Sequence, residues 1–332
     1  MGILSYPLRH WRGDYSLWLS FWISFVLLFA AAVAGFYYIL GNLGDDFEPV
    51  TGIRVIVGGL LVLCTLFVWQ SVGVWRSAKR RRQAGGGRIV SFLTVAGLLA
   101  GLTAIVLNVA VARPMLNMLG EIAAGRDAIS RAGYRIALGS DRLIIYGAIT
   151  YGVDRKLSDI LDARPSIRLV QLESTGGHRG AGLRLARVIL GRGLDTTTMH
   201  SCSSACTFAF LAGRERSLAP KAKLGFHSAG MRYAPKGLDE RGMLAATKRA
   251  QASMQRFYAE RGLPAAFIDR VLATPDQTMW FPSREELLQA GVITTQEAGK
   301  SPEPASAANA AANTARFSDE NSAASIKEGR QR

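Results

Sequence analysis

Residues 199–213 read MHSCSSACTFAFLAG, a run of small, hydroxyl-bearing residues that passes directly into an apolar segment. The apolar part has helical rather than alternating character, so we expect a helix to begin among the serines. Serine is a favoured N-cap because its oxygen accepts a hydrogen bond from a free backbone N–H. A serine at a helix N-terminus also suits nucleophilic attack, since the free N–H groups and the helix dipole stabilise an oxyanion. The stretch is therefore either a cap or a nucleophile segment.

Two further segments supply groups that acyl transfer needs. Upstream, the strand-like run Leu169–Glu173 leads into residues 174–177, which end in two glycines. Paired glycines let the backbone turn sharply and present an N–H to a ligand. Downstream, the strand-like run 222–226 leads to His227, and histidine is the commonest general base in proteins.

In this order the three segments resemble the Clp protease proteolytic subunit family, over roughly residues 142–292, about half the chain. Members of that family carry a Ser-Pro-Gly-Gly turn, an Ala-Ser-Met nucleophile segment and a Met-Ile-His segment. The resemblance implies that Ser204 is the nucleophile, because it stands nine residues before Gly213, as the family serine does before its own glycine.

The resemblance also assigns the other members of the site. Gly177 matches the turn glycine that provides one N–H of the oxyanion hole, and Ala205 provides the other as the residue after the nucleophile. His227 matches the general base, at the family's distance from Pro220. The implied activity is a serine peptidase that needs no cofactor.

The third member of the triad departs from the family pattern. Aligning residues 281–283 with the family's Phe-x-Ser segment places Met279 where the orienting aspartate stands. A thioether cannot take the place of a carboxylate beside an imidazole. Asp276, three residues earlier, fills the role if the loop after Pro275 bends differently. A Ser–His dyad, a backbone carbonyl partner and an inactive site are the alternatives.

Six further polar residues lie near the proposed site in the sequence, and each has two interpretations. The serines are competing nucleophiles or helix caps, the lysines form a Ser–Lys pair or are solvated, and the histidines contact substrate or make structural hydrogen bonds. These residues are Ser201, Ser203, Lys221, Lys223, His178 and His200.

Cys202 and Cys206 flank the proposed nucleophile. One helical turn separates Cα atoms by about 6 Å, within disulfide range, although a regular helix directs the Cβ atoms poorly. The bond becomes feasible if Cys202 lies before the helix, and two buried free thiols are the alternative. A disulfide would indicate an oxidising compartment. No cysteine or histidine cluster has metal-ligand spacing, so we expect no metal site.

The first third of the chain has the character of a membrane domain. Three uncharged apolar stretches, Tyr15–Gly44, Val55–Trp75 and Ile89–Ala112, each exceed the roughly 20 residues that cross a bilayer. The chain has 40 basic and 25 acidic residues, a formal net charge of +15. Much of this excess lies in short runs beside the apolar stretches. We therefore expect a lipid bilayer as partner rather than a nucleic acid.

The loop charges set the expected orientation. Residues 76–88 hold six basic residues and no acidic one, whereas Asp45, Asp46 and Glu48 follow the first stretch. The positive-inside rule then places the N-terminus and the basic loop in the cytoplasm. Three spans put everything after Ala112 outside, which is the periplasm if the protein lies in a bacterial inner membrane.

These patterns divide the chain into four parts. Residues 1–113 form the membrane domain, 114–133 a connecting segment, 134–295 an α/β domain, and 296–332 an Ala/Ser-rich tail that we expect to be disordered. Strands alternating with helices in the third part predict a largely parallel sheet with outer helices. The resemblance implies a spiral of β-β-α units, a fold shared with the crotonase superfamily.

A long amphipathic helix is expected from Glu240 to Arg261. The resemblance implies that it contributes to self-assembly into a homo-oligomer, and an ordinary packing helix is the alternative. The leading hypothesis for function is a membrane-anchored serine peptidase that cleaves peptides or proteins outside the cytoplasm. A catalytically silent peptide-binding module and a crotonase-type acyl-thioester enzyme are the two alternatives.

Overall fold

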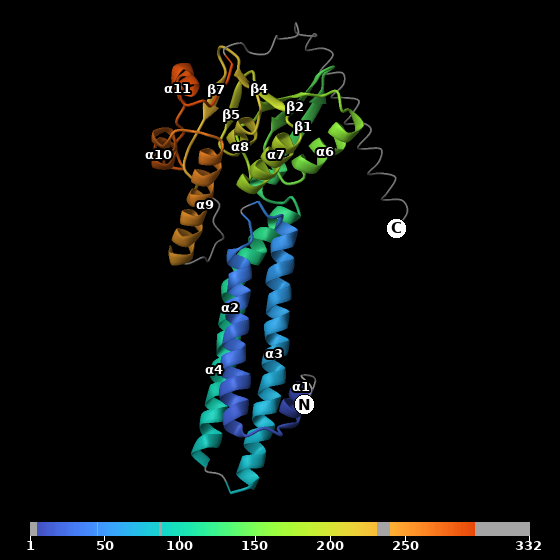
Figure 1. The fold of residues 1–332 in the computed structure, drawn as a ribbon, viewed down its shortest axis with the longest axis vertical. Helices are drawn as coiled ribbons and strands as arrows, with labels where there is room; N and C mark the ends of the chain where they lie inside the picture. Colours follow the sequence, from blue (N-terminus) through green and yellow to red (C-terminus); the bar gives the residue numbers. More distant parts are fainter. Residues whose placement is uncertain (1–4, 45, 86–87, 231–239, 296–332) are drawn as a thin grey trace. The chain divides into compact units, whose positions relative to one another are not determined.

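The computed structural model describes residues 5–44, 46–85, 88–230 and 240–295 (Figure 1). The chain separates into two compact units. One comprises residues 1–127 and 231–248, and the other residues 128–230 and 249–332. The predicted tail, residues 296–332, lies outside the described residues.

The first unit contains long apolar helices. After α1 (Ser5–Arg12), the π-helix η1 (Leu19–Leu27) continues directly into α2 (Leu28–Gly41), and α3 (Pro49–Gln83) and α4 (Arg88–Ala123) follow. Among the described residues, three helical stretches are long and apolar enough to cross a membrane: Leu19–Gly41, Pro49–Gln83 and Phe92–Ala132. The three predicted spans are thus confirmed as apolar helices, and their orientation stays a prediction.

Glycines let these helices approach one another. Helices α2, α3 and α4 run alongside each other (Figure 1). A Cβ on Gly97 of α4 would lie 2.7 Å from the ring of Phe21, and one on Gly101 would lie 2.8 Å from the ring of Phe67. Without side chains at these two positions, the aromatic rings pack directly against the α4 backbone. Helix α4 continues past the predicted span end through Pro114.

The second unit is built on a five-stranded sheet. The strand order is β1-β2-β3-β4-β6, with β1 antiparallel to β2 and the other neighbours parallel. The largely parallel sheet that the sequence predicts is therefore confirmed. The strands are β1 (Tyr134–Leu138), β2 (Arg142–Gly147), β3 (Leu169–Glu173), β4 (Asp195–Thr198) and β6 (Arg216–Leu218).

The segments that follow these strands form a second row of parallel pairings. Ile149, after β2, pairs with Gly177, after β3, and Ser174, after β3, pairs with Cys202, after β4. Strand β5 (Ser201–Ser203) then pairs with β7 (Lys223–Gly225), which follows β6. This row carries the residues that the sequence singles out for chemistry.

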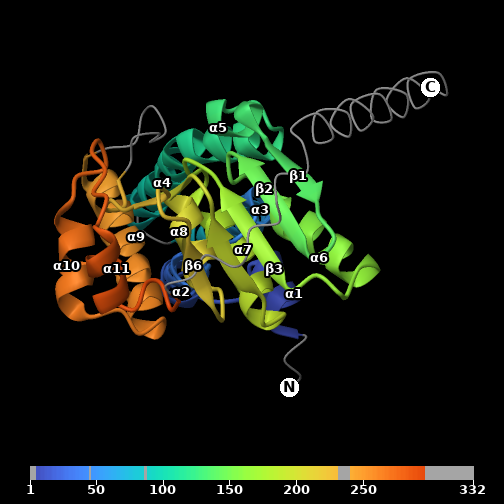
Figure 2. The ribbon, with the colours of Figure 1, turned by 90° about the horizontal axis from the view of Figure 1, so that it is seen from above.

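Helices follow the first three of these segments. They are α6 (Val153–Ala163), α7 (Arg179–Gly191) and α8 (Ala205–Leu211), and each packs on the next (Figure 2). Leu143, Ile145, Leu172, Leu185 and Phe210 are fully buried in the core beside them. A Cβ on Gly182 of α7 would overlap the carbonyl oxygen of Ala205, so glycine permits the close contact between α7 and α8.

The C-terminal part of the described chain is helical. Helices α10 and α11 lie side by side (Figures 1 and 2), and the Arg270–Glu286 ion pair of 3.1 Å joins them. The long helix expected from Glu240 is confirmed. The elements are α9 (Glu240–Glu260), α10 (Ala265–Ala273) and α11 (Arg284–Gln289).

Candidate active site

Ser204 forms the turn between a strand and a helix, because β5 ends at Ser203 and α8 begins at Ala205. Its backbone has φ 55° and ψ −123°, and among the described residues it is the one non-glycine residue with positive φ. Such a conformation costs about 1–3 kcal/mol. The Ser204 side chain makes no capping hydrogen bond to α8, so the capping interpretation is wrong for this serine. A strained serine between a strand and a helix is typical of a nucleophile.

His227 lies against the Ser204 hydroxyl. Its Nε2 is 2.7 Å from Ser204 Oγ, and its Nδ1 is 2.7 Å from the carbonyl oxygen of Ser228. A carbonyl oxygen only accepts, so this hydrogen bond assigns the proton to Nδ1. Nε2 is then unprotonated and accepts the hydrogen bond from the serine hydroxyl. The pair therefore has the tautomer that a general base requires.

The imidazole is held by a backbone carbonyl. Among the described residues, the Nδ1 hydrogen bond goes to Ser228 and not to Asp276. The Asp276 carboxylate lies beside Gly230 instead, where a Cβ would overlap it. Met279 packs beside Gly225, at 2.8 Å from where a Cβ would stand. Of the arrangements left open by the sequence, the geometry favours the backbone carbonyl partner.

The glycine turn between β3 and α7 lies against the serine. Gly176 has φ 119°, and a Cβ there would lie 2.8 Å from Ser204 Cβ and 3.3 Å from Ser204 Oγ. A Cβ on Gly177 would lie 2.6 Å from the backbone nitrogen of Ile149. Both positions therefore require glycine.

The backbone N–H groups of Gly177 and Ala205 lie in this region. Within the part of the chain that the structure describes, no hydrogen bond uses the N–H of Gly177 or of Ala205. An oxyanion hole needs donors that are not already engaged. The two residues proposed from the sequence meet this requirement.

Glu173 fixes the segment that leads into β5. Its side chain is 8% exposed and accepts from the backbone N–H groups of Met199 (2.7 Å), His200 (3.0 Å) and Ser201 (3.2 Å). Charge-assisted hydrogen bonds of this kind are about twice as strong as neutral ones. Burial raises the pKa of Tyr146 on the neighbouring strand, and the Glu173 charge adds to the rise. Sequence reasoning missed this role, although a glutamate closing an otherwise largely apolar strand was a signal.

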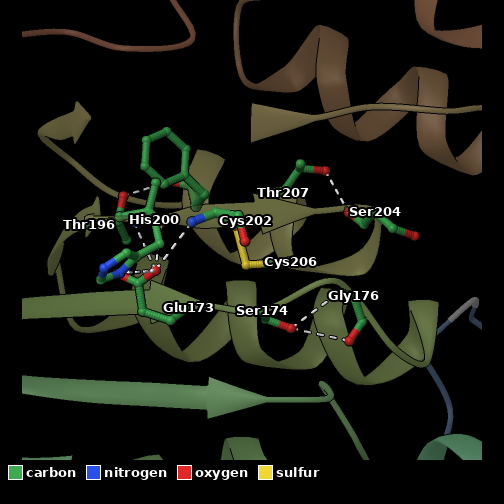
Figure 3. The surroundings of a disulfide bond; sticks show 12 residues. Glu173, Ser174, Gly176, Thr196, His200, Cys202, Ser204, Cys206 and Thr207 are labelled. Atoms are coloured by element: carbon green, nitrogen blue, oxygen red, sulfur yellow. Dashed lines mark hydrogen bonds and ion pairs between the residues drawn. A yellow bond between two sulfur atoms is a disulfide. The ribbon is translucent and has the colours of Figure 1, made fainter. Parts of the chain in front are cut away.

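A disulfide joins the two sides of the serine turn (Figure 3). Cys202 lies in β5 and Cys206 in the first turn of α8, with their Cα atoms 5.3 Å apart and both residues 0% exposed. Closing a five-residue loop removes about 2 kcal/mol of entropy from the unfolded chain in the loop-closure model. This contribution is of the same order as the strain at Ser204. Oxidation in the native protein stays a prediction.

The remaining candidates take other roles. Ser201 and Ser203 are paired in β5, so neither is a helix cap as the sequence suggested. The tertiary pairing with β7 overrides the local helix signal. His178 Nε2 is 3.3 Å from Ser130 Oγ, and His200 Nδ1 is 3.4 Å from the Glu173 carboxylate. These contacts favour structural histidines.

The two lysines proposed for a Ser–Lys pair are both exposed. Lys223 Nζ lies 5.9 Å from the ring centroid of Phe281. The hydroxyl of Ser204 is hydrogen-bonded to His227. The geometry therefore favours a histidine base over Lys221 or Lys223.

Comparison with known proteins finds matches among solved structures alone. No family model matches the sequence, and no curated protein matches it. Among solved structures, the chain is similar to ClpP1 from Listeria monocytogenes, with 21% identity and a TM-score of 0.38 over 46% of this chain and 88% of that chain. A mutant of the same protein gives 20% identity with the same coverage and TM-score. Any assignment of function therefore rests on the geometry of the site.

Proposed function

We propose that this chain is a membrane-anchored serine peptidase whose second unit has the ClpP/crotonase-like spiral of β-β-α units. The paired rows of strands support the spiral, because the segments after β2, β3 and β4 each add a second pairing and then lead into a helix. The order of glycine turn, serine turn and histidine along the chain supports the peptidase.

One observation carries the proposal: Ser204 Oγ and His227 Nε2 are 2.7 Å apart, with Ser204 held at φ 55°. A hydrogen bond of this length joins a nucleophile to its base in the resting site. The positive φ costs stability and brings no capping bond in return. Both features are explained together if the hydroxyl attacks a carbonyl.

The chemistry follows from these groups. Ser204 Oγ attacks the peptide carbonyl while its proton passes to His227 Nε2, which later gives it to the leaving amine. The N–H groups of Gly177 and Ala205 hold the oxyanion, each worth roughly 3–4 kcal/mol. Water then attacks the acyl-enzyme with His227 as base. The Ser228 carbonyl orients the imidazole, although as a dipole it stabilises imidazolium less than a carboxylate does.

The three apolar helices supply the anchor, and the bilayer is their partner. We place the N-terminus in the cytoplasm and the second unit in the periplasm of a bacterial inner membrane. The basic run at residues 76–88 and the disulfide support this orientation. An alkaline phosphatase fusion after Lys300 should be active and one after Arg80 inactive. An inactive fusion after Lys300 would overturn the orientation.

A fluorophosphonate probe tests the nucleophile. The full-length protein in detergent should be labelled on Ser204, and both Ser204→Ala and His227→Ala should lose labelling and peptide hydrolysis. Ser203→Ala is the matched control, because this neighbouring serine is paired in β5 and should leave labelling intact. Retention of labelling by Ser204→Ala would move the chemistry to another serine and refute the assignment.

The second candidate function is a catalytically silent peptide-binding module. The observation that favours it is the imidazole partner, a carbonyl in place of a carboxylate. In this case the wild-type protein resists the probe and hydrolyses no peptide, while peptides still bind with measurable affinity by calorimetry.

A further inference from the structure

The disulfide Cys202–Cys206 bridges the proposed nucleophile from two different elements (Figure 3). We propose that this bond is a positioning device on which catalysis depends, so that the dithiol form of the chain is folded but latent and the disulfide form is active. The inference rests on the proposed function and adds to it a mode of activation.

The serine turn is held differently on its two sides. On the strand side, Ser204 N–H donates to the carbonyl oxygen of Gly225 at 2.9 Å, and Gly176 packs against the serine side chain. On the helix side, Thr207 Oγ1 donates to the carbonyl oxygen of Ser204 at 2.7 Å. In addition to the main chain, the disulfide is a covalent cross-link between these sides. Without it, the turn can relax toward an unstrained φ by shifting the start of α8 relative to β5.

Cys202 also connects the serine turn to the glycine turn. Ser174 and Cys202 form a parallel bridge. In it, the N–H of Ser174 donates to the carbonyl oxygen of Ser201 at 2.9 Å, and the N–H of Ser203 donates to the carbonyl oxygen of Ser174 at 3.0 Å. Ser174 Oγ in turn accepts from the N–H of Gly176 at 3.1 Å. A shift of Cys202 therefore moves both the nucleophile and the turn that carries the proposed oxyanion donor.

The burial of both cysteines separates this bond from a surface disulfide. Each residue is 0% exposed, so in the folded protein the sulfurs are shielded from small reductants. The bond therefore forms during folding and then persists. Whether the bond is present therefore depends on the compartment in which the unit folded and not on later changes in the redox potential around the folded protein.

The activation step balances as thiol–disulfide exchange. The two thiols of the chain lose two protons and two electrons, and the disulfide of a thiol oxidase takes them up and becomes a dithiol. Such oxidases act in oxidising compartments, whereas cytosolic thiols stay reduced. In the proposed orientation, the peptidase is therefore latent until its second unit has left the cytoplasm.

The test uses the full-length protein in detergent. Alkylation of the denatured protein without reductant, followed by mass spectrometry, should find Cys202 and Cys206 unmodified in the wild type. In Cys202→Ala/Cys206→Ala, fluorophosphonate labelling and kcat should fall at least about tenfold with KM little changed, because misplacement of reacting groups slows the chemical step. Each single alanine variant should match the double one, since either removes the bond. Cys64→Ser is the matched control and should behave as wild type.

A second measurement separates positioning from stability. Wild-type protein produced in cells that lack a periplasmic thiol oxidase should show native circular dichroism and slow labelling. Because both cysteines are buried, oxidised glutathione should restore the rate only when it is present while this protein is unfolded and refolded. Assays are run well below the unfolding temperature of each sample. The double variant should gain no rate from the same refolding with oxidised glutathione.

Two results overturn the inference, and they are distinguishable. If wild type is labelled and either the double variant or the dithiol form is labelled at the same rate, the disulfide has no positioning role, while the peptidase proposal stands. If oxidised wild type with an intact disulfide is not labelled at all, both proposals fail. Failure of the double variant to fold leaves the decision to the dithiol form of the wild-type chain.

Discussion

Two turns in the second unit solve the same geometric problem with different residues. The turn from β3 to α7 reaches positive φ at Gly176, where no side chain is strained. The turn from β5 to α8 reaches positive φ at Ser204, where a side chain costs about 1–3 kcal/mol. Glycine would be the more stable choice at both positions. The difference is the one that the proposed peptidase requires, because its Ser204 hydroxyl has to stand beside His227.

The largest expected effect comes from making the two turns alike. Ser204→Gly should lower hydrolysis about 10³-fold or more, because the nucleophile is gone. The same variant should raise the free energy of unfolding by about 1 kcal/mol, because glycine adopts φ 55° without strain. Thermal unfolding and peptide hydrolysis measure the two effects. Ser204→Ala is the matched variant and should lose activity without gaining stability. If the Ser204→Gly protein has a lower free energy of unfolding than wild type, the backbone at Ser204 is not strained.

The reverse change adds a side chain to the glycine turn. Gly176→Ala should destabilise the protein by about 1–3 kcal/mol, because alanine is strained at φ 119°. Its methyl group also meets Ser204 Cβ, so labelling should fall about 100-fold in protein that remains folded. Gly191→Ala is the control, because this glycine of α7 has open space around it. If Gly176→Ala and Gly191→Ala lower stability and labelling equally, the glycine turn has no specific role in positioning Ser204.

A smaller effect is expected at the predicted triad carboxylate. Since His227 Nδ1 donates to the Ser228 carbonyl, Asp276→Asn should change kcat less than about threefold, whereas loss of a true triad aspartate costs about 10⁴-fold. Steady-state kinetics with a peptide substrate decides between them. A fall in kcat of a hundredfold or more would mean that the Asp276 carboxylate replaces the Ser228 carbonyl as the partner of His227 Nδ1 when substrate binds.

The smallest effect concerns the contact between Tyr258 and Thr207, which lies in the first turn of α8. Tyr258 is fully buried, with its hydroxyl 3.4 Å from Thr207 Oγ1, and burial raises the pKa of Tyr258. A pKa raised on folding gives stability that is complete below the unfolded value of about 10 and is lost as pH rises above it. When the pH is raised from 8 to 11, the melting temperature of the wild type should fall by more than that of Tyr258→Phe. Equal losses would contradict a buried, protonated tyrosine.

Much of the fold could be predicted because its signals are local. Long uncharged stretches predicted the three apolar helices, and the alternation of strands and helices predicted the parallel sheet. Strand β5 could not be predicted, since its three residues are held by β7, which is distant in sequence. In the site, the register of the resemblance singled out Ser204 and His227, whose side chains are hydrogen-bonded in the structure, and their catalytic role stays a prediction. The Ser228 carbonyl left no signal, because every residue carries one. Self-assembly through the helix from Glu240 stays a prediction.

The contact between Gly182 and Ala205 limits how this protein can vary. Any side chain at position 182 overlaps the carbonyl oxygen of Ala205, so α7 would have to move away from α8. That movement would displace the glycine turn that leads into α7, and with it the N–H of Gly177. In a genetic screen, substitutions at position 182 should therefore appear as loss-of-function alleles, although this residue lies within α7 and is not one of the residues assigned to the proposed site. An engineer who wishes to alter specificity has to leave this helix crossing untouched.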